Sequence, residues 1–231
     1  MIRIESAPWK VMVNHALAWF PRECCGILLG HNGNGARVVT EAMACVNAYD
    51  GDRPDRFTID PKDILRAQKR EFTGGPSLLG FFHSHPNEDS YFSSTDLANS
   101  WAGVSNVVLS IRDGKFAVAR SFIANQEKTE SRREELFYPP MPQILIPTPL
   151  RQYTGGKSAV TAAGTTVGEA LSALTSEHPE LRKNLYNDEG KLRSFVNIYL
   201  NDEDIRYLSK EATPCQDGDT LSIIPSIAGG R

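Results

Sequence analysis

The sequence predicts an α+β protein, of mixed α/β character, built from two domains. In the first 138 residues, short apolar runs of strand length and hairpin turns alternate with helical segments without forming regular βαβ repeats. Five of the 14 prolines lie between Pro139 and Pro149, where the missing amide hydrogen excludes a helix and disfavours a central strand. We therefore expect domains at 1–138 and 144–231, joined by a proline-rich linker at 139–143.

Cap and turn residues predict the elements of the first domain. Ser6 followed by Pro8 is typical of a helix start, with Ser6 as the N-cap. Asp113-Gly114 between two apolar runs predicts a hairpin. By the same reasoning we expect helices at 9–20, 61–72 and 94–101, and strands at 26–30, 36–46, 56–59, 78–82, 106–111 and 115–123.

Charge and composition exclude several classes of protein. A net charge of −3 gives no support for a nucleic-acid-binding surface or a polybasic membrane patch. No apolar run reaches the ~20 residues of a membrane helix, and the start of the sequence has no signal-peptide core. The four cysteines form no C-x-x-C pair, which favours a reduced, cytoplasmic setting. We expect neither a nucleic-acid nor a membrane partner.

The segment from Gly80 to Asp96 contains a candidate metal site. His83 and His85 are two residues apart at the end of an apolar strand, so both imidazoles point to the same side. Asp96 follows in the first turn of the next expected helix. Two imidazoles and one carboxylate, with water in the fourth position, form a typical catalytic zinc site. Such a bound water has a pKa near 7 and is a nucleophile at neutral pH.

Each of these residues also has a purely structural interpretation. Histidines at this spacing are often only packed or hydrogen-bonded. Ser93 can be only an N-cap, and Asp96 only its capping-box partner. Cys24 and Cys25 are better interpreted as small buried apolar residues than as metal ligands. The occurrence of both histidines, Ser93 and Asp96 within fourteen residues favours the metal site.

The pattern His83-x-His85-(seven residues)-Ser93-x-x-Asp96, with Glu23 before an apolar strand, resembles the JAMM (Mov34/MPN/PAD-1) zinc metalloproteases. The resemblance covers about residues 1–138 and implies a sandwich of the cytidine-deaminase type. It implies that His83, His85 and Asp96 bind Zn²⁺ and that Glu23 is the general base. The Ser93 hydroxyl would donate to the oxyanion of the tetrahedral intermediate. The segment 87–92, between the histidines and Ser93, is more acidic and aromatic than is usual in this family. The resemblance therefore extends to the metal ligands but not to substrate contacts made by this segment.

The second domain has a strand–strand–helix–strand–strand pattern, which suggests a β-grasp. We expect a hairpin of 144–150 and 157–162 joined through 153–156, a helix at 166–177 opened by a Thr166/Glu169 capping box, and strands at 196–200 and 220–224. With the ending Gly229-Gly230-Arg231, this half resembles the ubiquitin-like sulfur carriers of molybdopterin and thiamine biosynthesis, and more closely the carrier of thiocarboxylate-dependent cysteine biosynthesis. In that family the second glycine is terminal, so Arg231 blocks the reactive carboxylate.

The two resemblances together imply a zinc metallopeptidase fused to its own carrier. It would cleave after Gly230, remove Arg231, and release cysteine from the carrier terminus after sulfur transfer. The implied partners are its own or a sister carrier domain, an E1-like adenylating enzyme and a cysteine synthase. The sequence leaves two alternatives open: a ubiquitin-like modifier with a built-in isopeptidase, and a non-catalytic binding module. It also leaves open whether a molecule cleaves its own tail or that of another.

Overall fold

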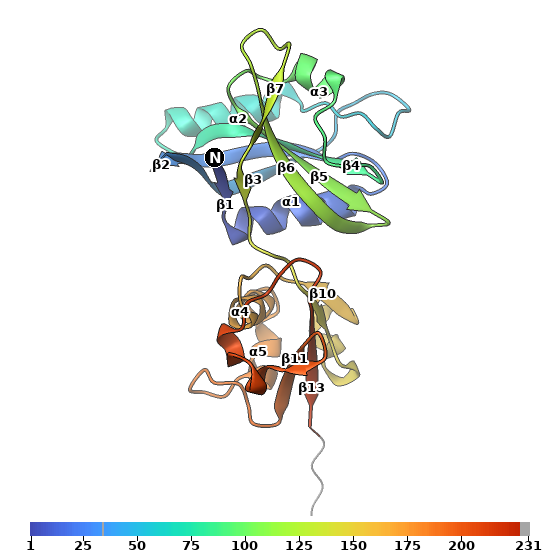
Figure 1. Cartoon of the computed structure of the whole chain (residues 1–231), viewed down its shortest axis with the longest axis vertical. Coiled ribbons are helices and arrows are strands. Elements are labelled where there is room, and N and C mark those ends of the chain that lie inside the picture. The colour runs from blue at the N-terminus through green and yellow to red at the C-terminus, as the bar shows by residue number, and fades with distance from the viewer. Residues whose placement is uncertain (34, 227–231) are drawn as a thin grey trace, which may run out of the picture. The chain divides into compact units, whose positions relative to one another are not determined.

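The computed structural model describes residues 1–33 and 35–226, and its chain divides into two compact units. The first unit is Met1–Tyr138 and the second is Pro139–Arg231 (Figure 1). No helix in the part of the chain that the structure describes is long and apolar enough to cross a membrane.

The first unit is an eight-stranded mixed sheet with helices packed against it, in the strand order β7-β6-β5-β4-β2-β3-β1-β8. Its strands are β1 (Ile2–Ile4), β2 (Cys25–Gly33), β3 (Ala36–Cys45), β4 (Ser77–Pro86), β5 (Ser105–Arg112), β6 (Lys115–Ala124), β7 (Ser131–Glu134) and β8 (Leu136–Phe137). Its helices are α1 (Ser6–Trp19), α2 (Pro61–Phe72) and α3 (Ser94–Asn99).

The centre of the sheet is buried because α1 and α2 cover opposite faces (Figure 1). In β2, Cys25, Ile27 and Leu29 form one small core with Ala67 of α2. The intervening Leu28 points to the other face, and it is also fully buried. This double coverage explains the continuous apolar runs that we read as buried strands.

The strands around β4 position the site. β4 pairs with β2 in antiparallel register, which places His83 opposite Cys25, and it pairs with β5 in parallel. At Gly80 a β-carbon would lie 1.9 Å from the carbonyl oxygen of Ser105, so the close approach of β4 and β5 requires glycine.

Several expectations for the first unit need correction. Helix α1 begins at Ser6, and its N-cap is Glu5, which makes no side-chain cap. The strand expected at 56–59 is reduced to a single bridge between Asn47 and Ile59. Strands β1, β7 and β8 were not expected, because they are two to four residues long and carry little periodic signal. The Asp113-Gly114 hairpin is confirmed, and both turn residues have positive φ, 49° and 71°.

The second unit is a five-stranded sheet in the order β10-β9-β13-β11-β12, with β9 and β13 parallel and the other neighbours antiparallel. Its strands are β9 (Gln143–Leu145), β10 (Ala159–Thr161), β11 (Val196–Leu200), β12 (Glu203–Asp204) and β13 (Thr220–Pro225), and its helices are α4 (Val167–Glu177) and α5 (Pro179–Leu185). Short 3₁₀ helices occupy Thr148–Thr154, Ile205–Tyr207 and Lys210–Ala212. The apolar face of α4 packs into the core over the sheet. This arrangement is the expected β-grasp.

Here too the local details differ from the expectations. The first strand ends at Leu145, and the residues expected to extend it form the 3₁₀ helix from Thr148. The helix α5 was not expected. Thr166 caps α4, but the returning Glu169 carboxylate accepts from Thr165, so the capping box is shifted by one residue.

The segment expected as a linker is hydrogen-bonded to the second unit. The Pro140 carbonyl accepts from the Gly164 amide at 3.0 Å. The Met141 amide donates to the Asp217 carboxylate, also at 3.0 Å. Residues 140–143 therefore belong to the β-grasp unit, and Gln143 is already the first residue of β9.

Candidate metal centre

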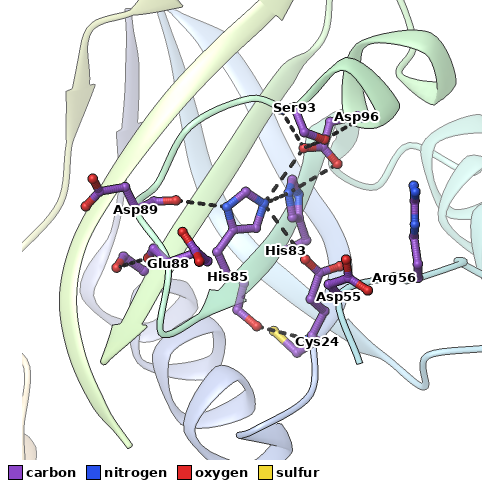
Figure 2. A network of polar contacts seen from close by, with 12 residues as sticks. Cys24, Asp55, Arg56, His83, His85, Glu88, Asp89, Ser93 and Asp96 are labelled. Atoms are coloured by element: carbon purple, nitrogen blue, oxygen red, sulfur yellow. Dashed lines mark hydrogen bonds and ion pairs between the residues drawn. The ribbon is translucent and has the colours of Figure 1, made fainter. Parts of the chain in front are cut away.

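His83 and His85 lie side by side at the end of β4 (Figure 2). Both side chains are buried, and their Nε2 atoms are 3.2 Å apart. Because β4 extends to Pro86, both residues belong to the strand itself, and this fixes their backbone in the sheet. The expectation that the imidazoles share one side is confirmed.

Asp96 reaches the histidines from the first turn of α3. Ser93 is the N-cap of this helix, and its hydroxyl oxygen accepts from the Asp96 amide at 3.1 Å. Asp96 Oδ2 in turn accepts from the Ser93 amide and hydroxyl, at 2.9 and 2.7 Å. Asp96 Oδ1 lies 3.5 Å from His83 Nε2, and Oδ2 lies 3.8 Å from His85 Nε2. The capping box is thus present, and it also aims the carboxylate at the two imidazoles.

The spacing of these three groups is compatible with one metal ion. Their ligand atoms lie within 4.8 Å of one another. A tetrahedral ion with bonds of about 2.1 Å places neighbouring ligand atoms about 3.4 Å apart. The distances of 3.2 Å between the imidazoles and 3.5 Å from His83 to Asp96 are close to this value. No rearrangement of the backbone is needed for the three groups to hold a metal together.

The loop after β4 sets the protonation of His85. Its Nδ1 lies 2.9 Å from the Asp89 carbonyl, which can only accept, so Nδ1 carries the hydrogen. The lone pair of the neutral ring is then on Nε2, which faces His83 and Asp96. The loop is held by the Ser110 hydroxyl, which donates to the Glu88 carbonyl at 2.6 Å, and by an ion pair of Arg112 with the Asp89 carboxylate.

Glu23 lies two residues before β2, and its Oε1 is 3.9 Å from His85 Nε2. Its backbone is fixed on both sides. The Glu23 amide donates to the Pro54 carbonyl at 3.0 Å, and the Glu23 carbonyl accepts from the Asn47 side chain at 3.2 Å. The structure therefore brings this carboxylate, about sixty residues away in sequence, to the edge of the histidine pair.

Burial and mutual charge shift the pKa values of these groups in opposite directions. Burial raises the pKa of Glu23 from 4.5 to about 7, in part offset by His85. Burial also lowers the pKa of His83. Burial opposes the shift at both remaining groups. At Asp96 the contacts with His83 and His85 outweigh burial and lower the pKa, and at His85 the contacts with Asp96 and the Asp89 carbonyl outweigh burial and raise the pKa. Asp96 therefore stays ionised, while Glu23 can exchange a proton near neutral pH.

The site opens into a cleft of about 980 Å³. Aromatic side chains form much of its wall: Phe57 stacks on the His83 ring at 4.7 Å, and Phe81 contacts Trp101 edge to face. Charged side chains also line the cleft, among them Arg53, Asp55, Arg56 and Glu88. A cleft of this kind can accept an extended peptide segment beside the candidate metal ligands.

The structure brings together Glu23, His83, His85, Ser93 and Asp96, all within one cleft. Cys24 and Cys25 are fully buried, and burial raises the pKa of their thiols, so both fit the interpretation as packed apolar residues. Among the described residues, the candidate ligand group contains no cysteine. The predicted tail residues Gly229, Gly230 and Arg231 lie outside the described residues.

Sequence reasoning missed three residues that support the site. Asn47 holds the backbone of Glu23, the Asp89 carbonyl orients His85, and Phe57 covers His83. The Asp89 contact uses a backbone carbonyl, which every residue type has, so the sequence carries no signal for it. Asn47 lies after a strand in a turn-like context, and an isolated asparagine there usually indicates only a turn.

The sheet, the histidine–aspartate group and the β-grasp define a JAB-like domain followed by a ubiquitin-like domain. Residues 6–128 match the family model described as prokaryotic homologs of the JAB domain, and residues 144–230 match the ThiS family. The chain therefore belongs to the prokaryotic JAB-domain homologs, with a ThiS-family domain in its second half. This membership confirms both resemblances and the predicted fold class.

Known proteins resemble the chain in two groups. The sulfur carrier protein CysO of Mycobacterium tuberculosis is 44% identical over 89 residues, which are 38% of this chain and 96% of CysO. The desampylase of Haloferax volcanii is 34% identical over 84 residues, which are 36% of this chain and 58% of the desampylase. A solution structure from Desulfitobacterium hafniense matches with a TM-score of 0.52 and 28% identity, covering 59% of this chain and 92% of that protein. The JAB-domain family and the similarity to a desampylase indicate a hydrolase.

Proposed function

We propose that the chain is a zinc-dependent peptidase fused to its own sulfur carrier, and that it hydrolyses the amide bond after Gly230. The observation that carries the proposal is Glu23 Oε1 at 3.9 Å from His85, beside the His83, His85 and Asp96 group. The ending Gly229-Gly230-Arg231 on a ThiS-family domain supports the choice of bond.

In this proposal His83, His85 and Asp96 hold the ion. Zn²⁺ bound there supplies a Lewis acid and a water nucleophile at neutral pH. Glu23 removes a proton from the attacking water and gives it to the leaving nitrogen, which its raised pKa favours. Hydrolysis leaves a carboxylate on Gly230 and releases arginine.

Ser93 has a second task in the proposal. Its hydroxyl donates to Asp96 in the free protein. When the oxyanion forms, the hydroxyl turns to donate to it, while the Ser93 amide keeps its own bond to Asp96. One such donor is worth ~3–4 kcal/mol in a well-studied protease.

The new Gly230 carboxylate is then the substrate of an E1-like adenylating enzyme and of sulfur transfer. The similarity to CysO supports this role for the second unit, and a cysteine synthase is the partner that fits it. In cysteine biosynthesis by sulfur transfer, the same site would later release cysteine from Gly230. The runner-up is an isopeptidase acting on lysine-linked carriers, which the similarity to the desampylase favours.

Intact-mass spectrometry tests the proposal. We expect the purified full chain with one equivalent of Zn²⁺ to lose the mass of one arginine residue, and Glu23→Gln to keep it. Glu127→Gln, which removes an exposed carboxylate far from the candidate site in sequence, should behave as wild type. Retention of Arg231 by the wild type would contradict the proposal.

Varying the protein concentration in the same experiment separates two modes of cleavage. A first-order rate that is independent of concentration means that each molecule processes its own tail. A rate that rises with concentration means that one molecule processes another.

A further inference from the structure

Arg56 is a cation that lines the cleft, and the proposed mechanism gives it no role. It lines the same cleft as Glu23, His83 and His85, and it is half-buried. Figure 2 shows it on the side of the histidines opposite Asp89. Among the described residues, no hydrogen bond or ion pair occupies its guanidinium group. Burial raises the pKa of the Glu23 carboxyl, and the charge of Arg56 offsets a small part of this rise.

The backbone fixes Arg56 beside Glu23. The Asn47 side-chain amide donates to the Glu23 carbonyl at 3.2 Å and to the Arg56 carbonyl at 2.8 Å. Two residues earlier, the Pro54 carbonyl accepts from the Glu23 amide. The segment that carries Arg56 is therefore attached to Glu23 at both polar groups of the Glu23 backbone. The side chains of Glu23 and Arg56 both line the cleft.

The neighbouring charges leave Arg56 free for a ligand. Asp55 is already engaged with Arg53, which donates to both of its carboxylate oxygens at 2.9 and 2.5 Å. That exposed pair is internally neutral. Among the described residues that line the cleft, Arg56 is thus the cation without a carboxylate partner.

In the proposed reaction, the α-carboxylate of the leaving residue comes close to Glu23. Glu23 must reach the leaving nitrogen to protonate it. When the leaving group is a single terminal amino acid, its α-carboxylate is two bonds from that nitrogen. When the leaving group is a lysine side chain, the nearest backbone carbonyl carbon is six bonds away. A cation beside Glu23 therefore suits a leaving group that is a single terminal amino acid, because the α-carboxylate of that residue lies close to the leaving nitrogen.

We propose that Arg56 binds the α-carboxylate of the leaving residue and so makes the site selective for a single C-terminal amino acid over a lysine-linked isopeptide. The inference rests on the proposed function and specifies its substrate class. The planar guanidinium can bind a carboxylate through two parallel hydrogen bonds, which fix both the position and the direction of the leaving residue.

The experiment uses the inactive Glu23→Gln full chain as substrate, prepared with either a free C-terminal carboxylate or a C-terminal amide on Arg231. Wild-type, Arg56→Gln and Arg56→Lys full chains serve as enzymes with Zn²⁺, and intact mass follows the loss of the last residue. We expect the wild type to cleave the carboxylate form roughly 10- to 100-fold faster in kcat/KM than the amide form. Arg56→Gln should lose this preference by slowing only on the carboxylate form, and Arg56→Lys should keep part of it.

Arg22→Gln is the matched control. It removes an arginine adjacent to Glu23 in sequence that does not line the cleft, and it should keep the wild-type preference. Equal cleavage of both substrates by the wild type, or equal slowing of both by Arg56→Gln, would overturn the role of Arg56 while leaving the peptidase intact. If the wild type cleaves neither substrate and also keeps its own Arg231, the proposed function fails and this inference with it. If it removes only its own Arg231, the rates of self-processing are compared instead, and an equal rate in the wild type and in Arg56→Gln would overturn the role of Arg56.

Discussion

Single residues in this site both stabilise a helix end and orient a candidate metal ligand. Ser93 and Asp96 form a complete capping box, and the same Asp96 carboxylate faces both histidines. The structural and the metal-binding interpretations of Asp96 are therefore both satisfied by one geometry. The cap fixes the carboxylate through two donors, so a potential metal ligand is already oriented before any ion binds.

Glu23 illustrates a conflict between site chemistry and stability. Its carboxyl is buried, and its pKa of about 7 in the folded state compares with 4.5 when exposed. Between these pH values the unfolded chain releases a proton that the folded chain keeps. Raising the pH from 4.5 to 7 therefore favours unfolding, and the effect is constant above pH 7.

We expect Glu23→Gln to stabilise the metal-free protein above pH 7, because glutamine has no proton to lose. A pKa of about 7 in place of 4.5 corresponds to an upper limit of roughly 3–4 kcal/mol in the free energy of unfolding. Denaturant unfolding of both proteins in chelator at pH 4.5 and pH 8 measures this difference. It should be near zero at pH 4.5 and positive at pH 8. A difference that is the same at both values would show that Glu23 is not held in a desolvated position.

At the scale of elements, the site depends on how closely β4 approaches its neighbours. β4 carries both histidines, and its register against β2 and β5 decides where they lie. Gly80 is in the stretch where β4 and β5 are too close for a side chain. Three residues further on, the same strand presents His83.

We expect Gly80→Ala to destabilise the first unit by roughly 2–3 kcal/mol or more, because the added methyl group meets the rigid Ser105 backbone at 1.9 Å. Zinc binding should weaken with it, since the clash shifts β4. Gly33→Ala is the matched control, because a β-carbon there meets no atom closer than 3.7 Å. Thermal unfolding and zinc titration report both effects. Equal stability of the two variants would contradict the close packing of β4 against β5.

At the scale of the whole molecule, the chain consists of two units with separate cores. The core of the second unit is built around α4, with Leu171 and Leu174 fully buried. The candidate metal ligands all belong to the first unit. We therefore expect a core substitution or a bound ligand in one unit to change the stability of that unit and not of the other.

Leu171→Ala should destabilise the second unit alone, by ~2–5 kcal/mol, because it leaves a cavity in a closed core. Leu28→Ala is the corresponding change in the first unit, where the side chain is also fully buried. Zn²⁺ should raise the melting temperature of the first unit only. Calorimetry of the full chain with and without Zn²⁺ separates the two transitions. A single transition that responds to both substitutions and to zinc would contradict independent units.

The sequence by itself determined the class of fold, the two families and the order of the candidate ligands. These follow from local features: strand periodicity, the His83-x-His85 spacing, the Ser93 capping box and the proline cluster that marks the second unit. Each of these features operates within a few residues, so the chain itself displays it. The short strands β1, β7 and β8 carry no such local signal, because only their neighbours in the sheet make them strands.

Only the tertiary structure decided what surrounds the ligands. The Asp89 carbonyl on His85, the Asn47 amide that joins Glu23 to Arg56, and Phe57 stacked on His83 all depend on contacts between distant segments or on backbone atoms. Burial of Glu23 likewise requires the folded cleft, because desolvation is a property of the whole environment. Residue types can therefore predict which groups could bind a metal, whereas proton positions and the selectivity of the cleft depend on the fold.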